Sequence, residues 1–112
     1  MTIDLTSHAA AAGQAIVVGV DTGVGRATAL ELAEAGYDVG VTWAADEPVA
    51  LRTAQEIRAM GRWSEVRQLD PAWILADPSS LQTVDGLTRA LGGLTVLVLT
   101  ATPPSPEHFV DQ

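Results

Sequence analysis

Short apolar runs alternate with helix-like segments along most of this chain, and this alternation restricts the folds that it can adopt. Four runs have the length of strands, the third being more polar than the others, and they span residues 14–20, 37–43, 63–70 and 94–101. Three intervening segments carry apolar residues at helical spacing, over residues 25–36, 48–61 and 76–93. The order β-α-β-α-β-α-β predicts an α/β fold with a parallel sheet and right-handed crossovers.

Capping residues and apolar spacing define the expected helices further. Asp46 followed by Pro48, and Asp77 followed by Pro78, are typical of a capped helix start. Gly86, inside the third segment, should weaken that helix by about 1 kcal/mol relative to alanine. Each segment is expected to bury the face that carries its spaced apolar residues: Ala27, Leu30 and Ala33, then Leu51, Ala54, Ile57 and Met60, then Leu81, Val84, Leu87 and Leu91.

The composition indicates a folded, acidic chain and argues against several classes of function. Of the 112 residues, 47% are hydrophobic and 18% are charged, which is typical of a globular domain with a modest core. The formal net charge of −8 would repel nucleic acid and anionic membranes. The sequence contains no cysteine, no apolar run long enough to span a bilayer and no basic segment before its first alanines, so we expect a cytoplasmic protein.

Three glycines separate the first expected strand from the first expected helix. They let the backbone turn tightly, and the free N–H groups at a helix start favour an anion such as a phosphate. The last of them also lets the helix pack closely on the strand. The turn supplies six candidate cofactor-binding residues: Gly19, Asp21, Thr22, Gly23, Val24 and Gly25. The plainer interpretation is a tight turn that binds nothing.

The spacing Gly19-x-x-x-Gly23-x-Gly25, with the later segments GRATALELAEAGYDVGVTW and LGGLTVLVL, resembles the short-chain dehydrogenase/reductase family. The resemblance implies a Rossmann-like three-layer sandwich with strand order 3-2-1-4 and flanking helices. It also implies an NAD or NADP cofactor and oxidoreductase chemistry. Because family members are usually much longer, this chain resembles the N-terminal half of that fold.

On this basis the expected organisation is one truncated domain with short flanks. Residues 1–13 form a lead-in, residues 14–102 form the Rossmann-like domain, and residues 103–112 form a Pro-rich tail. The two histidines, His8 and His108, lie in these flanks without acidic residues at metal-ligand spacing. No metal site is therefore expected.

The chain departs from the family at the positions that carry its chemistry. The family uses a Tyr-x-x-x-Lys pair with a serine, whereas all six basic residues here are arginines. Tyr37 is followed by DVGV and is best explained as a packing residue at a strand start, with Asp38 beside it facing solvent. The family's NNAG stretch is replaced by Leu-Thr-Ala-Thr at residues 99–102. We therefore expect no hydride transfer by this chain alone, and its catalytic residues, if it is an enzyme, are unknown.

The positions that would recognise the ribose of the cofactor carry no charge. An acid about 20 residues past the glycines selects NAD, and a nearby arginine accommodates the NADP phosphate, but residues 42–45 are Thr-Trp-Ala-Ala. Asp70 resembles a family residue that contacts adenine, although Pro71 after it has no N–H to donate. Trp43 stacks on adenine or fills its pocket, and filling is the favoured interpretation. We expect NADP(H) or NAD(H) to bind weakly at most.

Three functions remain open on the sequence alone. The first is a truncated reductase-like protein without reductase chemistry, acting as a homo-oligomeric binding or assembly module. The second is a cofactor-independent cyclase or isomerase that takes a small apolar substrate in the same cleft, lined by Trp43, Trp63 or Trp73, with Asp21 or Asp70 as its polar group. The third is one half of a two-chain reductase whose partner supplies the tyrosine and the lysine.

The last expected strand has no neighbour on one side in the order 3-2-1-4. Residues 94–101 are apolar on both faces, and an apolar edge with unpaired backbone groups promotes association. We expect a homodimer or a higher oligomer that covers this strand. The alternative is a monomer whose residues 102–110 fold back over the edge.

Overall fold

The structure of the chain is a computed structural model, and it describes residues 10–100. Its elements, in chain order, are β1 (Gly13–Val18), α2 (Gly23–Glu34), β2 (Tyr37–Trp43), α3 (Glu47–Ala59), β3 (Ser64–Gln68), α4 (Pro71–Ala76), the 3-10 turn η1 (Pro78–Ser80), α5 (Leu81–Leu91) and β4 (Val96–Leu99). The expected alternation of strands and helices is confirmed. The short helix α4 and the turn η1 are additions that the sequence analysis did not separate. The Pro-rich tail, and the alternative in which residues 102–110 cover the last strand, lie outside the described residues.

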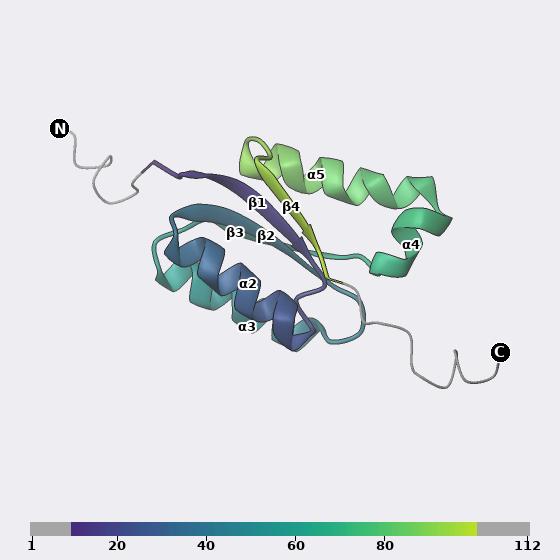
Figure 1. Cartoon of the computed structure of the whole chain (residues 1–112), viewed down its shortest axis with the longest axis horizontal. Helices are drawn as coiled ribbons and strands as arrows, with labels where there is room; N and C mark the ends of the chain where they lie inside the picture. Colours follow the sequence, from purple (N-terminus) through teal and green to yellow (C-terminus); the bar gives the residue numbers. More distant parts are fainter. Residues whose placement is uncertain (1–9, 101–112) are drawn as a thin grey trace.

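The strands of the described residues form one parallel sheet in the order β3-β2-β1-β4. Helices α2 and α3 cover one face of this sheet, and α4 and α5 lie on the other (Figure 1). The three-layer Rossmann-like arrangement and the strand order 3-2-1-4 are therefore both confirmed. None of the described helices combines the length and the apolarity that a membrane span requires.

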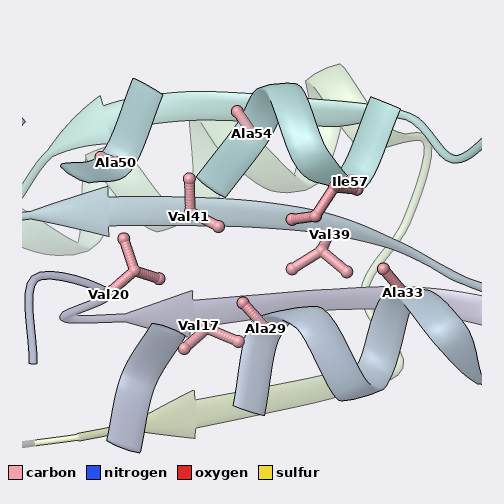
Figure 2. Packing of buried hydrophobic residues seen from close by; sticks show 9 residues of the cluster. All are labelled: Val17, Val20, Ala29, Ala33, Val39, Val41, Ala50, Ala54 and Ile57. Carbon is pink, nitrogen blue, oxygen red and sulfur yellow. The ribbon is translucent and has the colours of Figure 1, made fainter. Parts of the chain in front are cut away.

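The core between the sheet and the helices α2 and α3 is built from small residues. Valines of β1, β2 and the turn after β1 pack against alanines of the two helices, with one isoleucine as the largest member (Figure 2): Val17, Val20, Ala29, Ala33, Val39, Val41, Ala50, Ala54 and Ile57. Each of these residues is 3% exposed or less. Alanines let a helix approach the sheet closely, and branched valines fill the pleated surface, so this face is densely packed.

The core on the opposite face uses larger side chains under a single long helix. Its buried members come from β1, from the residue that follows β3 and from α5: Ile16, Val18, Leu69, Leu87 and Leu91. Gly40 of β2 makes room for α5, because a Cβ there would lie 3.2 Å from Leu91 Cδ1 and 3.3 Å from Leu87 Cδ2. Leu97 and Leu99 of β4 share this face, in register with the β1 members of the cluster, yet they are 46% and 55% exposed. The face is therefore incompletely covered at β4.

Some of the expected buried helix faces are wrong in detail. In α2 the buried stripe begins at the glycine turn and repeats every fourth residue: Gly25, Ala29 and Ala33. Ala27 therefore faces solvent instead of the core. Leu51 of α3 and Met60, the residue that follows α3, are exposed because they lie beside the buried stripe, and Leu81 is exposed at the first residue of α5. Helical spacing alone left open which of two neighbouring stripes meets the sheet.

The predicted capping aspartates are confirmed. Asp46 Oδ1 accepts a hydrogen bond from the Val49 amide at 3.3 Å, at the start of α3. Asp77 Oδ1 accepts from the Ser79 hydroxyl at 2.7 Å and from the Ser79 amide at 3.0 Å. These bonds, the hydroxyl one first, lower the pKa of Asp77. Asp77 thus caps η1, which leads into α5.

Asp38 is a correction to the expectation of a solvent-facing carboxylate. Asp38 and Arg62 are each only 8% exposed. The Oδ1 atom of Asp38 accepts from the Trp63 amide at 2.9 Å and lies 3.8 Å from Arg62 Nε. Arg62 also donates through Nη1 to the Gly36 carbonyl at 2.8 Å. These contacts tie the starts of β2 and β3 together at the amino end of the sheet.

Candidate functional site

The glycine turn lies at the carboxyl end of β1, bonded to the ends of β2 and β4. The Gly19 amide donates to Thr42 Oγ1 at 3.1 Å, and the Val20 amide donates to the Thr42 carbonyl at 2.9 Å. On the other side, Thr100 Oγ1 donates to the Gly19 carbonyl at 2.8 Å. Gly19 has φ of 95°, in the left-handed region that favours glycine. Both neighbouring strands therefore fix the start of the turn.

The two remaining glycines of the turn have different roles. A Cβ on Gly25 would lie 2.0 Å from the Gly19 carbonyl oxygen, which only a glycine avoids. A Cβ on Gly23 would meet nothing within 4 Å. Gly25 is thus required for packing helix α2 against the turn, whereas Gly23 keeps open the space in front of the helix start.

Thr22 closes one part of the helix start and leaves another part free. Its Oγ1 accepts from the Gly25 amide at 2.9 Å and donates to the Gly19 carbonyl at 3.0 Å. Among the described residues, no group accepts a hydrogen bond from the amides of Gly23 or Val24. The Val24 side chain is exposed. Two backbone donors therefore point out of the positive end of α2 beside open space, which suits an anionic group.

Asp21 joins the glycine turn to the turn between β2 and α3. Its Oδ2 atom accepts three hydrogen bonds from consecutive backbone amides: Ala44 at 3.1 Å, Ala45 at 2.8 Å and Asp46 at 3.1 Å. Burial raises the pKa of Asp21, and hydrogen bonds from the backbone amides of Ala45, Ala44, Asp46 and Asp21 itself together lower it by more, so the pKa lies below its usual value. The carboxylate is therefore held as an anion between the two turns.

This placement of Asp21 was not predicted from the sequence. Positions 42–45 carry no charged residue, but a carboxylate from 23 residues earlier reaches the amide of Ala44. The signal was available in the expected strand order. Because β1 and β2 are neighbours and parallel, the turns that follow them lie side by side, and a side chain from one can bond the backbone of the other.

Trp43 and Asp70 lie at the same end of the sheet as the glycine turn. Trp43 ends β2, is half-buried and packs against the core beneath α2 and α3, which favours the filling interpretation over adenine stacking. The Leu69 amide donates to the Trp43 carbonyl at 2.9 Å, and this bond holds the residue before Asp70 beside the end of β2. Asp70 Oδ1 accepts from the Ala72 amide at 2.9 Å and so caps the start of α4.

Comparison with known proteins identifies the family to which this arrangement belongs. The family model described as short chain dehydrogenase matches residues 13–111. This chain belongs to the short chain dehydrogenase family. The uncharacterized oxidoreductase YohF of Escherichia coli strain K12 is 36% identical over 97 residues, which cover 87% of this chain and 37% of that protein. The 3-oxoacyl-(acyl-carrier-protein) reductase FabG of Staphylococcus aureus is 35% identical over 88 residues, which cover 78% of this chain and 34% of that reductase.

Solved structures of short chain dehydrogenases agree with this assignment. The acetoin dehydrogenase of Enterobacter cloacae is 41% identical and superposes with a TM-score of 0.76, covering 86% of this chain and 37% of that one. The acetoin dehydrogenase YohF of Salmonella typhimurium is 36% identical, with a TM-score of 0.75 over 83% of this chain and 38% of that one. The chain thus spans little more than a third of the length of these relatives. It contains the glycine turn and the strands beside it.

The glycine turn fits part of the cofactor that the family implies. The free amides of Gly23 and Val24, at the positive end of α2 and beside open space, suit a pyrophosphate. By contrast, the amides of residues 44–46, at the end of β2 where a ribose would be recognised, already bond Asp21. The turn therefore matches the phosphate-binding part of a dinucleotide site in a short chain dehydrogenase.

Other parts of the described structure offer weaker candidates for a functional site. A shallow cavity of about 370 Å³ lies near the start of β3, lined by Arg58, Arg62, Trp63, Ser64 and Glu65. It lies at the opposite end of the strands from Trp43, so Trp63 does not line the cleft expected at the glycine turn. Within residues 10–100 there is no group of three or more His, Cys, Asp or Glu side chains placed to bind a metal. The two histidines lie outside this range.

Proposed function

We propose that this chain is a nucleotide-binding module of the short chain dehydrogenase fold that does not itself carry out reductase chemistry. The observation that carries the proposal is the pair of free amides at Gly23 and Val24, which face open space at the start of α2. They would hold the pyrophosphate of NAD(H) or NADP(H) by hydrogen bonds and by the helix dipole. Trp43 and Asp70, at the same end of the sheet, would border the adenosine.

We also propose that this chain does not transfer hydride on its own. The sequence contains no lysine, so a Tyr-x-x-x-Lys pair cannot be built from it. Its tyrosine, Tyr37, begins β2 and packs against the core beneath α2 and α3, at the amino end of the strand. A phenol in that position is remote from the glycine turn at the carboxyl end. Oxidation of NADH or NADPH by the purified chain, with acetoin and a panel of other carbonyl compounds, is expected to stay at background.

Cofactor binding is testable by calorimetry on the purified chain. We expect a dissociation constant in the high micromolar range, about −5 to −6 kcal/mol, because only the pyrophosphate end of the site has strong donors. Gly23→Val should abolish binding, since its side chain would occupy the space in front of the amides. Gly86→Val is the matched control, because Gly86 is also a helical glycine with open space at its Cβ position. Low-micromolar affinity, or a Gly23→Val variant that binds like the wild type, would contradict the proposal.

The module is further proposed to form a homodimer, or a higher oligomer, through β4. Leu97 and Leu99 supply exposed apolar surface there, and β4 is an edge of the sheet without a charged residue. A second copy packed on this edge would bury the leucines in an isologous interface. A specific interface of this kind buries about 800 Å² on each partner. Light scattering at tens of micromolar is expected to report at least twice the chain mass, and a monomer would refute the self-association.

A further inference from the structure

The three amides that follow β2 form an anion-binding cradle, and the chain fills this cradle itself. Consecutive N–H groups at a turn converge on one point and bind anions such as phosphates and carboxylates. Here Ala44, Ala45 and Asp46 all donate to the same oxygen, Asp21 Oδ2. The other oxygen of Asp21, Oδ1, takes no part in these three bonds. The carboxylate thus blocks the cradle on one side and offers an acceptor on the other.

The location of this cradle connects it to the proposed nucleotide site. Asp21 precedes the free amides of Gly23 and Val24 by two and three residues in the same turn. A dinucleotide whose pyrophosphate lies at those amides, with its adenosine directed toward β2, meets the turn of residues 44–46. In dinucleotide folds the ribose is recognised at the end of the second strand, by an acid for NAD or beside an arginine for NADP. In this chain the acid comes from the glycine turn instead of from the second strand.

Resting on the function proposed above, we propose that Asp21 selects NAD(H) against NADP(H). Its Oδ1 atom accepts a hydrogen bond from the ribose 2′-hydroxyl of NAD. A 2′-phosphate would have to displace the carboxylate from the amides or lie against it, and the two negative charges would repel each other. The arginine of the first turn of α2, Arg26, pairs through Nη2 with Glu56 of α3, so part of its charge is already offset there.

The test compares NAD⁺ and NADP⁺ by calorimetry on the wild-type chain and on two alanine variants. The wild type is expected to bind NAD⁺ about tenfold or more tighter than NADP⁺, from the like-charge cost. Asp21→Ala empties the cradle and should bring the affinity for NADP⁺ up to that for NAD⁺ or above it. Glu34→Ala is the matched control, because it removes one exposed negative charge at the far end of α2. Its preference for NAD⁺ should equal that of the wild type.

The outcomes separate this inference from the function on which it rests. If wild-type chain binds both dinucleotides equally, or NADP⁺ more tightly, the selection by Asp21 is refuted while nucleotide binding stands. If neither dinucleotide binds, both proposals fail. If Asp21→Ala keeps the wild-type preference, Asp21 only ties two turns together and the inference is wrong. Should that variant not fold by circular dichroism, Asp21→Asn keeps the shape and an acceptor oxygen, and the preference should fall without the charge.

Discussion

The two faces of the sheet are covered to different degrees. Beneath α2 and α3 the core residues are 3% exposed or less, including the valines of both central strands. On the opposite face α5 packs against β1, β2 and β3, while Leu97 and Leu99 of β4 stay about half-exposed. The same strands supply apolar side chains to both faces. The difference therefore lies in the covering helices, two on one side against one long helix on the other.

Because of this difference, the two proposed functions, nucleotide binding and self-association, belong to different parts of the fold. We call the face beneath α2 and α3 the complete face and the face beneath α5 the incomplete face. The turns that join β1 to α2 and β2 to α3 are the glycine turn and the amide cradle that Asp21 fills. Positions in that half are held by dense packing, so a ligand would meet a preformed site. The incomplete face ends in β4, where the unburied leucines favour a second copy. Binding and self-association are thus proposed for different halves, and variants can alter one without the other.

The largest expected effect is on the complete face, at Gly25. Gly25→Ala places a Cβ 2.0 Å from the Gly19 carbonyl oxygen, a backbone atom fixed by Thr100. Helix α2 must move off β1, and we expect a loss of about 3 kcal/mol or more in the free energy of unfolding. Gly23→Ala, two residues earlier with open space, should stay within about 0.5 kcal/mol. Chemical denaturation followed by circular dichroism measures both. Equal stability of the two variants would show that the turn is not tightly packed.

The second effect concerns the incomplete face and should change assembly instead of stability. Leu97→Glu introduces a charge into the exposed surface of β4, and we expect it to convert the proposed dimer into a monomer. Gln68→Glu is the matched control, because it adds the same charge to an exposed residue of the other edge strand, β3. Light scattering at tens of micromolar compares the two. If Gln68→Glu also dissociates the oligomer, or if neither variant does, β4 is not the interface.

Most of the fold, but less of the candidate site, could be predicted from the sequence. The strand order, the layers, the caps at Asp46 and Asp77 and the role of Gly25 followed from local patterns and from the family resemblance. The buried stripe of α3 followed only in part, because Ala50 and Leu51 lie four and three residues before Ala54, and helical spacing does not choose between them. The placement of Asp38 and Asp21 was missed for another reason. Each bonds backbone or side chains of a neighbouring element, and single-segment patterns carry no such information.

A smaller effect is expected in α5, the helix that covers the incomplete face. Gly86→Ala should stabilise the chain by about 0.5–1 kcal/mol, because alanine favours the helix and a Cβ there meets nothing within 4 Å. Gly40→Ala, on the strand beneath, is the contrasting variant and should not stabilise, since its Cβ would press on Leu87 and Leu91. Thermal unfolding distinguishes them. A Gly86→Ala variant less stable than the wild type would indicate that Gly86 has a packing role.

The smallest effect is the acid dependence contributed by Asp21 and Asp77, one in each half. Both folded pKa values lie below the ordinary value, so the ionised forms favour the folded state. Their contribution is therefore present above about pH 4, the usual pKa of the unfolded carboxyl, and is lost as the pH falls through the lower folded value. Asp21→Asn and Asp77→Asn should each be less stable than the wild type at pH 7, and the gap should close at lower pH. Asp21→Asn should show the larger gap, because the Asp21 carboxylate accepts three backbone bonds between two turns, whereas the Asp77 carboxylate accepts from Ser79 and is exposed. Denaturation at a series of pH values measures the gap, and a gap that widens toward acid would mean that the folded state does not favour the ionised carboxylates.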